Sequence, residues 1–520
     1  MRLNIPARAG LTVKDKILQL SVLVIAALFC FVKLSLKPPH SDESVNGFFV
    51  NQIWENGFFT YDPGNYHGPL LFYLFQVSEK IFGFGIHSLR IVTALFSFLT
   101  VSLILLSKNA LGRYAYLFVA LTLGLSPGMI FFGRSAIHES AFVFFQILWM
   151  LGFLKSRESP DREGFLWFFT GFLGCILLKE TFVILGISFI MAWVWLEVSF
   201  KVPYLINKQT GSPGPIEVAH IQKPILPKTI FTITVVWFAF YTGFFHHWKG
   251  ASDFFIAIMP WLKTGTGGSG HDKPFYYWLM LFRQYEWGAV IGLIASFAGV
   301  LSRSWKIRFF SALALVNWLI YSYIPYKTPW CVISILWPFV FVVGLWIEIV
   351  FAKARPKKIL ASVSLSLALV VLVHSAVTSY RLNFRDYANP SGPYVYVQTK
   401  NDFKIIEDII GSKTGTSPDF HNMTVTIRLD DPWPLPWFFS RFPNVRYGDY
   451  RESVKPEGDI IFAETGSDDA ALAGLYLRRL IDLRDARKPI YVYLKASTFD
   501  TPAAPDGAAL PGFSMVRLKR

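Results

Sequence analysis

Two adjacent carboxylates stand where the chain leaves its first apolar segment. Asp42 and Glu43 follow Pro38-Pro39, a pair that ends a preceding helix, and apolar residues recur at helical spacing as far as Ile53. The pattern predicts a helix lying along the bilayer surface. A carboxylate held there, within reach of a lipid headgroup, can act as a general base or metal ligand. These residues alone support equally well a structural role, in which Asp42 caps the helix and Glu43 is a solvated first-turn acid.

A second set of candidate residues lies at the ends of later apolar segments. Charged side chains are costly at such positions unless they are paired or face a wet cavity. Because these residues fall in alternate loops, they predict a polar cavity at one membrane interface. The set consists of His67 in YHGP; Arg134, His138 and Glu139 in GRSAIHES; Lys179 and Glu180 between two apolar segments; His271 and Lys273 in a longer loop; and Tyr326 and Lys327 in YKTPW.

The elements that must position these residues are membrane helices. The chain has 520 residues, is 53% hydrophobic and contains 50 phenylalanines, which is not the composition of a soluble protein. Eleven apolar segments of roughly 16–25 residues predict a polytopic α-helical membrane protein with about 11 transmembrane helices. They lie near 17–36, 86–107, 114–132, 137–154, 164–179, 181–199, 229–246, 277–301, 309–325, 330–351 and 359–379.

The loops between these segments differ in charge. One alternate set is rich in Lys and Arg, for example Lys108, Arg157 and Lys306, and is expected to be cytoplasmic. The N-terminus should then be cytoplasmic, whereas Asp42, Glu43 and the region after 380 should be extracytoplasmic, as in a plasma (inner) membrane protein. Residues 1–380 are predicted to form the membrane domain, with outer loops 37–85 and 247–276.

Three features exclude other classes of protein. The net charge of +15 accompanies no nucleic-acid-binding motif, so basic residues are interpreted as topology signals. Cys30, Cys175 and Cys331 all fall in apolar segments, which excludes a disulfide framework. The first apolar segment has no small-residue cleavage site before Asp42, and is therefore expected to be an uncleaved span.

Residues 381–520 are more polar, and their apolar runs shorten to strand length. Strands are predicted at 395–397, 423–427, 459–462 and 490–494, with helices near 402–411, 434–441 and 468–484. The alternation predicts an extracytoplasmic α/β domain. Its segment DDPWPLPWFF, residues 430–439, is expected to be domain core or a membrane-facing rim rather than a platform for sugar rings.

The ordered motifs resemble a known group of enzymes. The acidic pair, YHGPLLFYL, GRSAIHES, LLKET, KPFYYW and YKTPW together resemble the GT-C glycosyltransferases. The nearest branch is glycosyltransferase family 39, with the protein O-mannosyltransferases and the lipid A aminoarabinose transferases, and a bacterial and archaeal branch labelled flippase-associated. The resemblance implies transfer of a sugar from a polyprenyl-phosphate donor in the membrane to an extracytoplasmic acceptor. The absence of a Gly-rich phosphate loop agrees with a donor that is not a nucleotide sugar.

The resemblance also implies roles for the candidate residues. Asp42 would be the general base that accepts the acceptor's proton, and Glu43 would orient the acceptor, assist Asp42 or bind a cation. Arg134 is the first candidate for the donor phosphate, because a guanidinium binds phosphate oxygens in a bidentate way. Lys179, Lys273 and Lys327 are second candidates, although Lys273 and Lys327 fit equally well as snorkelling anchors. The remaining residues, His67, His138, Glu139, Glu180, His271 and Tyr326, would contact substrate in the cavity.

Some relatives bind a divalent cation, so Glu43, His138, Glu139 and His271 are candidate ligands. Their spacing is not that of a closed zinc site, and no metal is assigned.

Two other functions stay open. A lipid-linked glycan flippase, or an accessory protein of one, would explain the cavity but would not need an acidic pair on a surface helix. A ligase or polymerase of whole glycans would share the architecture and differ in its acceptor. The acceptor itself, whether a glycolipid, lipopolysaccharide, surface glycan or protein, is not encoded in a recognisable motif.

Overall fold

The computed structural model describes residues 12–158, 162–206, 225–267, 270–352, 358–416, 418–466, 468–484, 488–499, 510 and 512–517. Two compact units divide the chain. The first, the membrane unit, contains residues 1–34 and 56–386. The second, the C-terminal unit, contains residues 387–520 together with Ser35–Glu55, so the segment that carries the acidic pair belongs to it.

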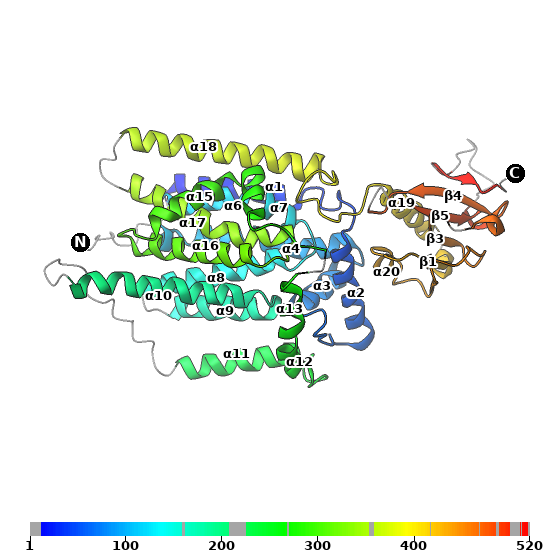
Figure 1. Ribbon diagram of the computed structural model, residues 1–520, viewed down its shortest axis with the longest axis horizontal. Coiled ribbons are helices and arrows are strands. Elements are labelled where there is room, and N and C mark those ends of the chain that lie inside the picture. The colour runs from blue at the N-terminus through cyan, green and yellow to red at the C-terminus, as the bar shows by residue number, and fades with distance from the viewer. Residues whose placement is uncertain are drawn as a thin grey trace. The chain divides into compact units, whose positions relative to one another are not determined.

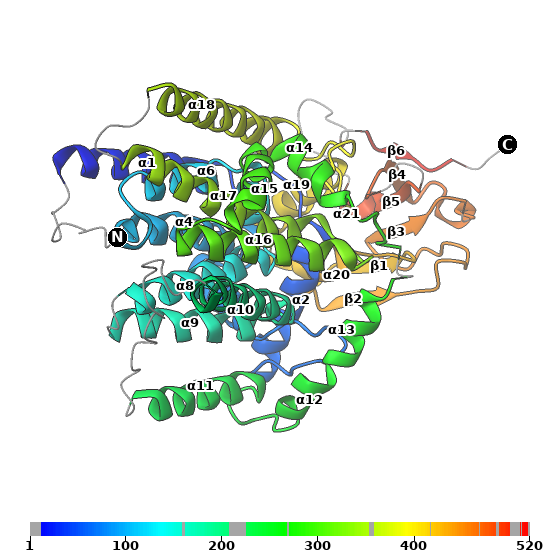
Figure 2. The ribbon, with the colours of Figure 1, turned by 60° about the vertical axis from the view of Figure 1, so that its left-hand side comes forward.

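All eleven apolar segments are helical, and two of them are broken into a pair of helices (Figures 1 and 2). The unbroken ones are α1 (Val13–Phe31), α4 (Ile86–Leu106), α8 (Glu139–Glu158), α9 (Arg162–Leu178), α10 (Phe182–Ile206), α11 (Ile225–Tyr241), α16 (Trp305–Tyr323), α17 (Val332–Phe351) and α18 (Lys358–Tyr380). The broken ones are α6 (Ala115–Gly124) with α7 (Pro127–Gly133), and α14 (Tyr277–Tyr285) with α15 (Trp287–Gly299).

Length and apolarity identify which of these helices can span a membrane. In the described residues, four helical stretches are long and apolar enough to span a bilayer: Ile86–Leu106, Phe182–Phe200, Pro329–Phe351 and Lys358–Arg385. The α6–α7 pair, bent by 55°, would be a fifth. A helical membrane protein with several spans is confirmed, whereas the count of eleven stays a prediction.

The two breaks are joined by one buried carboxylate. Glu286 separates α14 from α15, and its Oε1 accepts the backbone N–H of Gly128 (2.7 Å) while its Oε2 accepts the Ser126 hydroxyl (2.8 Å). Ser126 itself caps α7, with Pro127 at the first helical position. The carboxylate thus accepts a hydrogen bond from a backbone N–H in the first turn of α7, a group that has no partner within the helix.

Shorter helices complete the membrane unit. The apolar stretch after Pro69 forms α3 (Leu70–Phe82) and packs against α4. The others are α5 (Lys108–Leu111), α12 (Gly250–Ile256), α13 (Ile258–Gly265), the 3₁₀ turn Pro329–Cys331 and the π-helical turn Arg381–Arg385. Helix α18 lies at one side of the unit and α11 at the opposite side (Figures 1 and 2).

Glycines allow two central helices to approach closely. A Cβ on Gly152 of α8 would lie 2.1 Å from the backbone nitrogen of Phe168 in α9, and one on Gly171 would lie 2.3 Å from that of Trp149. Small residues of this kind let membrane helices pack backbone against backbone. The α8–α9 pair is consequently a rigid support for the residues at its ends.

The basic loops meet at one end of the membrane unit. Lys108 pairs with Asp15 at the start of α1 (3.0 Å), and Arg157 at the end of α8 pairs with Glu197 of α10 (2.9 Å). Lys306 forms an ion pair with Glu158. Loops that are separate in sequence therefore share one face, as the charge pattern predicted.

The C-terminal unit is built on a six-stranded mixed sheet. Strand β1 pairs in parallel with β2 and β3, and the remaining pairs are antiparallel, in the order β2-β1-β3-β5-β4-β6. Helix α19 (Asp402–Thr416) packs on one face through Phe403, Ile406 and Ile410. The strands are β1 (Thr424–Arg428), β2 (Asn444–Tyr447), β3 (Ile460–Glu464), β4 (Tyr476–Ile481), β5 (Ile490–Lys495) and β6 (Ser514–Met515); short helical turns are Pro418–Asn422, α20 (Leu435–Phe438), Ala470–Leu472 and α21 (Ala496–Phe499).

Two predictions within this unit were wrong. Residues 395–397 form a turn instead of a strand, and Val397 has φ of 50°, which a strand does not allow. The predicted helix 468–484 is a 3₁₀ turn followed by β4, because Gly474 at φ 74° ends the helical turn and the next residues pair with β5. Strands β2 and β6, which are short, were not predicted.

Candidate active site

The acidic pair opens helix α2 (Ser41–Asn56), and its two carboxylates are held differently. Glu43 is fully buried, and its Oε2 accepts the backbone N–H of His40 at 2.7 Å. This is the carboxylate half of a capping box, in which a residue in the first turn satisfies a free amide before the helix. Glu43 therefore shapes the helix start and is not the solvated first-turn acid of the structural interpretation.

His40 supplies the other half of this arrangement. The backbone N–H of Asp42 donates to His40 Nδ1 (3.0 Å), so that nitrogen carries no hydrogen, and Nε2–H donates to the carbonyl of Tyr396 (2.7 Å). The imidazole thus fixes the backbone of Asp42. Sequence reasoning missed His40, because histidine is not a favoured N-cap residue; the only signal was a Glu three positions later.

Asp42 is the accessible member of the pair. Its side chain is 45% exposed, and its nearest partners are the Ser41 hydroxyl (3.4 Å) and His40 Nδ1 (3.9 Å). Burial, with a smaller contribution from the Asp42 carboxylate, raises the pKa of Tyr396. An exposed carboxylate on a fixed helix start has the access that a general base needs.

Helix α2 is anchored to the aromatic segment of the C-terminal unit. A Cβ on Gly47 would lie 2.4 Å from Nε1 of Trp437, which is buried, and the Phe48 ring meets Trp433 edge to face at 5.8 Å. Arg441 lies over the ring of Trp54 at 5.8 Å. Trp437 is therefore both a buried residue of the C-terminal unit and the surface on which α2 packs.

A polar cluster lies in the membrane unit where the HGP turn meets the α9–α10 junction. We call His67, His138, Glu139, Lys179 and Glu180 the junction cluster. Gly68 N–H donates to the Leu178 carbonyl (3.0 Å), and a Cβ on Gly68 would lie 2.2 Å from the Leu177 oxygen, so only glycine fits. This contact brings His67 Nδ1–H to Glu180 Oε2 at 3.0 Å. Because the carboxylate only accepts, Nδ1 of His67 is the donor of this hydrogen bond.

The rest of the junction cluster is almost completely buried. Lys179 forms an ion pair with Glu139, both side chains being enclosed, and the His138 ring lies 4.7 Å from that of His67. His138 Nε2 is buried and has no hydrogen-bond partner among the described residues. Burial opposes ionisation of Glu180, but His67 and Lys179 outweigh it and hold the pKa of the carboxyl below its ordinary value. The cluster offers carboxylate and imidazole groups, which are suitable partners for hydroxyl groups.

A second cluster joins two loops of the membrane unit. We call His271, Asp272, Lys273, Tyr326 and Lys327 the loop cluster. Asp272 and Tyr326 form an isolated antiparallel bridge, in which Lys273 N–H donates to the Pro325 carbonyl (3.0 Å) and Lys327 N–H to that of His271 (3.2 Å). The His271 and Tyr326 rings lie 5.2 Å apart.

The lysines of the loop cluster are in different surroundings. Lys327 is buried, and its ammonium group donates to the carbonyls of Lys273 (3.1 Å) and Ile324. Burial lowers the pKa of Lys327, opposed in part by Asp272. Lys273 is partly exposed. The Lys327 ammonium group is thus bound to backbone carbonyls, which is not the arrangement of a snorkelling anchor.

Arg134 is placed differently from its predicted role. Its guanidinium is buried and donates to the carbonyls of Phe29 (2.9 Å), Val32 (2.8 Å) and Lys33 (2.7 Å), with a longer contact to Cys30 (3.3 Å). These are the free carbonyls at the end of α1. With its donors directed there, Arg134 acts as a cap of α1, which argues against the predicted phosphate contact.

The candidate metal ligands are not brought together. In the described part of the chain, no three His, Cys, Asp or Glu side chains converge in a way that could hold a metal ion. Glu43 lies in the C-terminal unit, His138 and Glu139 lie in the junction cluster, and His271 lies in the loop cluster.

Comparison with known proteins identifies part of the membrane unit. Residues 66–207 match the family model described as dolichyl-phosphate-mannose-protein mannosyltransferase. The match covers less than half of the chain and shows that this segment is similar to that family of membrane glycosyltransferases. It contains the whole junction cluster but neither Asp42 nor the loop cluster. The predicted resemblance to glycosyltransferase family 39 is confirmed, and with it the class of enzyme.

Solved structures extend the likeness to nearly the whole chain. ArnT from Cupriavidus metallidurans bound to undecaprenyl phosphate is 14% identical, with a TM-score of 0.58 over 94% of this chain and 99% of its own. Its apo structure is 13% identical, with a TM-score of 0.59 over 92% and 98%. This chain therefore has the ArnT fold, a helical membrane domain with a C-terminal mixed-sheet domain.

The protein O-mannosyltransferase complex of S. cerevisiae bound to its sugar donor is 16% identical and covers 52% of this chain and 37% of its own. Its TM-score of 0.32 is too low for a comparison of folds. No protein of curated function matches the sequence.

Proposed function

We propose that the protein transfers a sugar from a polyprenyl-phosphate donor to an extracytoplasmic acceptor. The main support is the match of residues 66–207 to a family of lipid-phosphate mannosyltransferases. The fold agrees, because the similar ArnT structure contains undecaprenyl phosphate. The acceptor class, whether glycolipid, lipopolysaccharide, surface glycan or protein, is left open by both.

Asp42 is the proposed general base. A hydroxyl is a poor nucleophile until a base removes its proton, and Asp42 is the exposed carboxylate of the pair. Glu43 acts through position, because its buried carboxylate and His40 together set the start of α2. The proton taken up by Asp42 balances the negative charge that leaves on polyprenyl phosphate.

The junction cluster and the loop cluster differ in net charge, and we assign them different roles on that basis. The junction cluster has one lysine against two glutamates, which disfavours a phosphate, so its imidazoles and carboxylates are assigned to sugar hydroxyls. The loop cluster has Lys273 and Lys327 against Asp272, a net positive balance. We assign the donor phosphate to the loop cluster, with the partly exposed Lys273 as its main contact.

Orientation is proposed from the basic residues. Because Lys108, Arg157 and Lys306 meet at one end of the membrane unit, that end is taken as cytoplasmic. The HGP turn, the α9–α10 junction and the loop cluster come from the alternate connections, and so are extracytoplasmic. The site would then receive a donor that has already crossed the membrane.

The decisive test uses purified protein in lipid, a panel of radiolabelled polyprenyl-phosphate monosaccharides, and membrane extract as acceptor. We expect transfer from one donor of the panel. The transfer rate should fall at least 100-fold in Asp42→Asn, because the base is lost while the side chain keeps its size. Glu55→Gln is the matched control, since Glu55 is an exposed carboxylate near the other end of α2. It should transfer at the wild-type rate.

Two outcomes would contradict the proposal. Transfer by Asp42→Asn at the wild-type rate would remove Asp42 as base. Tight donor binding without turnover on any donor, but with movement of donor across the bilayer, would favour the flippase alternative.

A further inference from the structure

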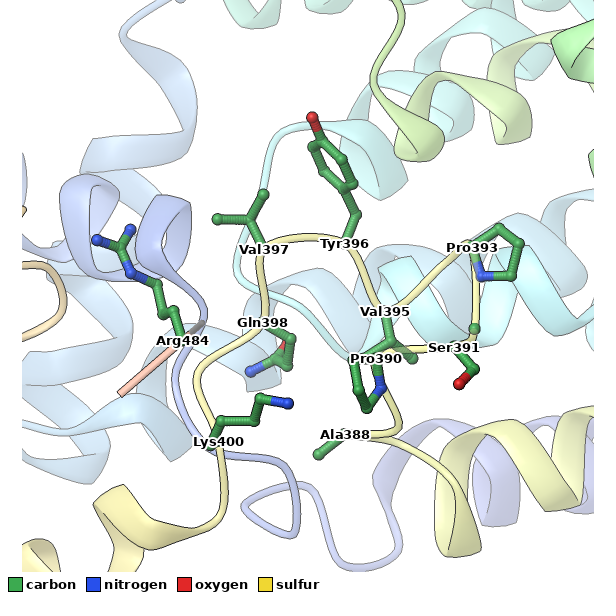
Figure 3. A pocket seen from close by; sticks show the side chains of 11 residues that line it. Ala388, Pro390, Ser391, Pro393, Val395, Tyr396, Val397, Gln398, Lys400 and Arg484 are labelled. Atoms are coloured by element: carbon green, nitrogen blue, oxygen red, sulfur yellow. The ribbon is translucent and has the colours of Figure 1, made fainter. Parts of the chain in front are cut away.

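The C-terminal unit contains a small cavity that none of the roles above uses. It has a volume of about 230 Å³ and is lined by residues of the loop 388–400 together with Arg484 (Figure 3). All of its walls come from the C-terminal unit. Its polar lining is provided by Ser391, Tyr396, Gln398, Lys400 and Arg484.

The cavity carries positive charge. The ammonium group of Lys400 has no hydrogen-bond or ion-pair partner among the described residues, and in Figure 3 the side chain points across the loop toward Ala388 and Pro390. Arg484 is held by Asp431 through its carboxylate and, at 3.2 Å, its carbonyl. One cation is therefore fixed in place, and the other is available to a ligand.

The loop that forms the cavity is held in an unfavourable backbone conformation. Val397 has φ of 50°, which is a rare value for a β-branched residue. On either side of it, the Tyr396 carbonyl accepts from His40 Nε2–H (2.7 Å) and Gln398 Nε2 donates to the Pro38 carbonyl (2.8 Å). Bulky residues in such conformations cluster at binding sites, where the surrounding contacts maintain them.

These two contacts link the cavity to the proposed base. The segment Pro38–His40 directly precedes Asp42, and His40 also accepts the backbone N–H of Asp42. The same loop thus lines the cavity on one side and fixes the start of α2 on the other. A ligand in the cavity would be bound within the assembly that positions Asp42.

We propose that this cavity is a subsite for an oxyanion carried on a sugar, a phosphate or a carboxylate, in the acceptor. The proposal rests on the transfer function proposed above, and narrows the acceptor to an anionic saccharide. The cavity is smaller than the roughly 300–1,000 Å³ of sites for larger ligands, so it has room for a single sugar unit. Lys400 pairs with the oxyanion, and Ser391 and Gln398 contact the hydroxyl groups.

The test measures binding by the full-length protein in nanodiscs of phosphatidylcholine, which carry no net charge. The probes are glucose 6-phosphate, glucuronate, glucose and inorganic phosphate, titrated calorimetrically without donor. Lys400→Gln removes the charge, and Lys455→Gln is the matched control, because Lys455 is an exposed lysine of the same unit outside the cavity.

We expect both anionic sugars to bind at least tenfold more tightly than glucose. Loss of one charge-assisted hydrogen bond in Lys400→Gln should weaken them by about 10- to 100-fold, while Lys455→Gln binds as the wild type does. Equal binding of glucose, no binding of either anion, or an unchanged Lys400→Gln would overturn the proposal. Inorganic phosphate binding as tightly as glucose 6-phosphate would overturn the assignment to a sugar.

Repeating the titration with Asp42→Asn separates this proposal from the transfer function. Binding does not need catalysis, so an inactive protein that binds anionic sugars supports the subsite alone. An active transferase whose cavity binds neither anion refutes the subsite alone.

Discussion

Gly68 is the residue on which the geometry of the junction cluster depends most directly. In Gly68→Ala, the new Cβ would lie 2.2 Å from the Leu177 oxygen and 2.4 Å from its carbonyl carbon. Ordinary contact begins at 3.4 Å, so the turn must move by about 1.2 Å (3.4 − 2.2). The obstacle is backbone at the end of α9, which cannot rotate away as a side chain would.

The movement has two costs that can be estimated. Overpacking at a rigid site costs about 1–3 kcal/mol, and losing the Gly68–Leu178 hydrogen bond costs about 0.5–1.5 kcal/mol. We therefore expect the free energy of unfolding to fall by about 1.5–4.5 kcal/mol, the sum of the two costs. Because His67 moves with the turn, its 3.0 Å contact with Glu180 is lost. A displacement of 1 Å at a substrate contact is expected to lower the transfer rate roughly 100-fold.

Gly186→Ala provides the matched control. Gly186 lies within α10, and the nearest atom to its Cβ would be a ring carbon of Trp149 at 4.0 Å, so alanine fits there. Both variants are compared by denaturant unfolding in detergent and by transfer rate per folded molecule. If Gly68→Ala matched Gly186→Ala in both measurements, the close approach of the HGP turn to α9 would be wrong.

Two further variants test the structural roles assigned here. Glu43→Ala should lower the free energy of unfolding by about 1–2 kcal/mol, because the His40 amide loses its acceptor, whereas Glu43→Gln keeps an acceptor oxygen and should lose less; equal stability of both in thermal unfolding would contradict the cap. Arg134→Lys should also destabilise the protein, because a single ammonium group cannot reach all the carbonyls that accept hydrogen bonds from the two terminal nitrogens of the guanidinium. The KM for the donor should stay unchanged. A raised KM without loss of stability would instead restore the phosphate role.

Hydropathy predicted the helices well because membrane segments are specified by length and apolarity alone. Each of the eleven segments is helical, and the HGP turn, the α9–α10 junction and the loop cluster fall in the alternate connections, as expected. The breaks in α6–α7 and α14–α15 were not predicted. They depend on Glu286 reaching Ser126, a contact between residues 160 positions apart.

The roles of individual site residues were harder to predict, for a physical reason. Arg134 is directed at backbone carbonyls, which every residue has and which therefore leave no sequence signal. A sequence motif does not distinguish the two adjacent carboxylates Asp42 and Glu43. The structure does, because Glu43 is buried in a cap with His40 whereas Asp42 is left exposed. In the C-terminal unit, the Ala- and Leu-rich residues 468–484 have helical propensity, but pairing with β5 determines their structure.

The proposed assignment of phosphate to the loop cluster and of sugar to the junction cluster can be tested by comparing two lipids, one with the sugar and one without it. Undecaprenyl phosphate carries the phosphate without the sugar, so it should bind through the loop cluster alone. Lys273→Gln should weaken its binding about tenfold, and Glu180→Gln should leave that binding unchanged but weaken the glycosylated donor, because the junction cluster then loses a carboxylate for sugar hydroxyls. Arg303→Gln, at the basic end of the membrane unit, is the control for loss of a cation. If Lys273→Gln and Glu180→Gln weakened both lipids by the same factor, the clusters would act as one site, and the assignment of phosphate to one and sugar to the other would fail.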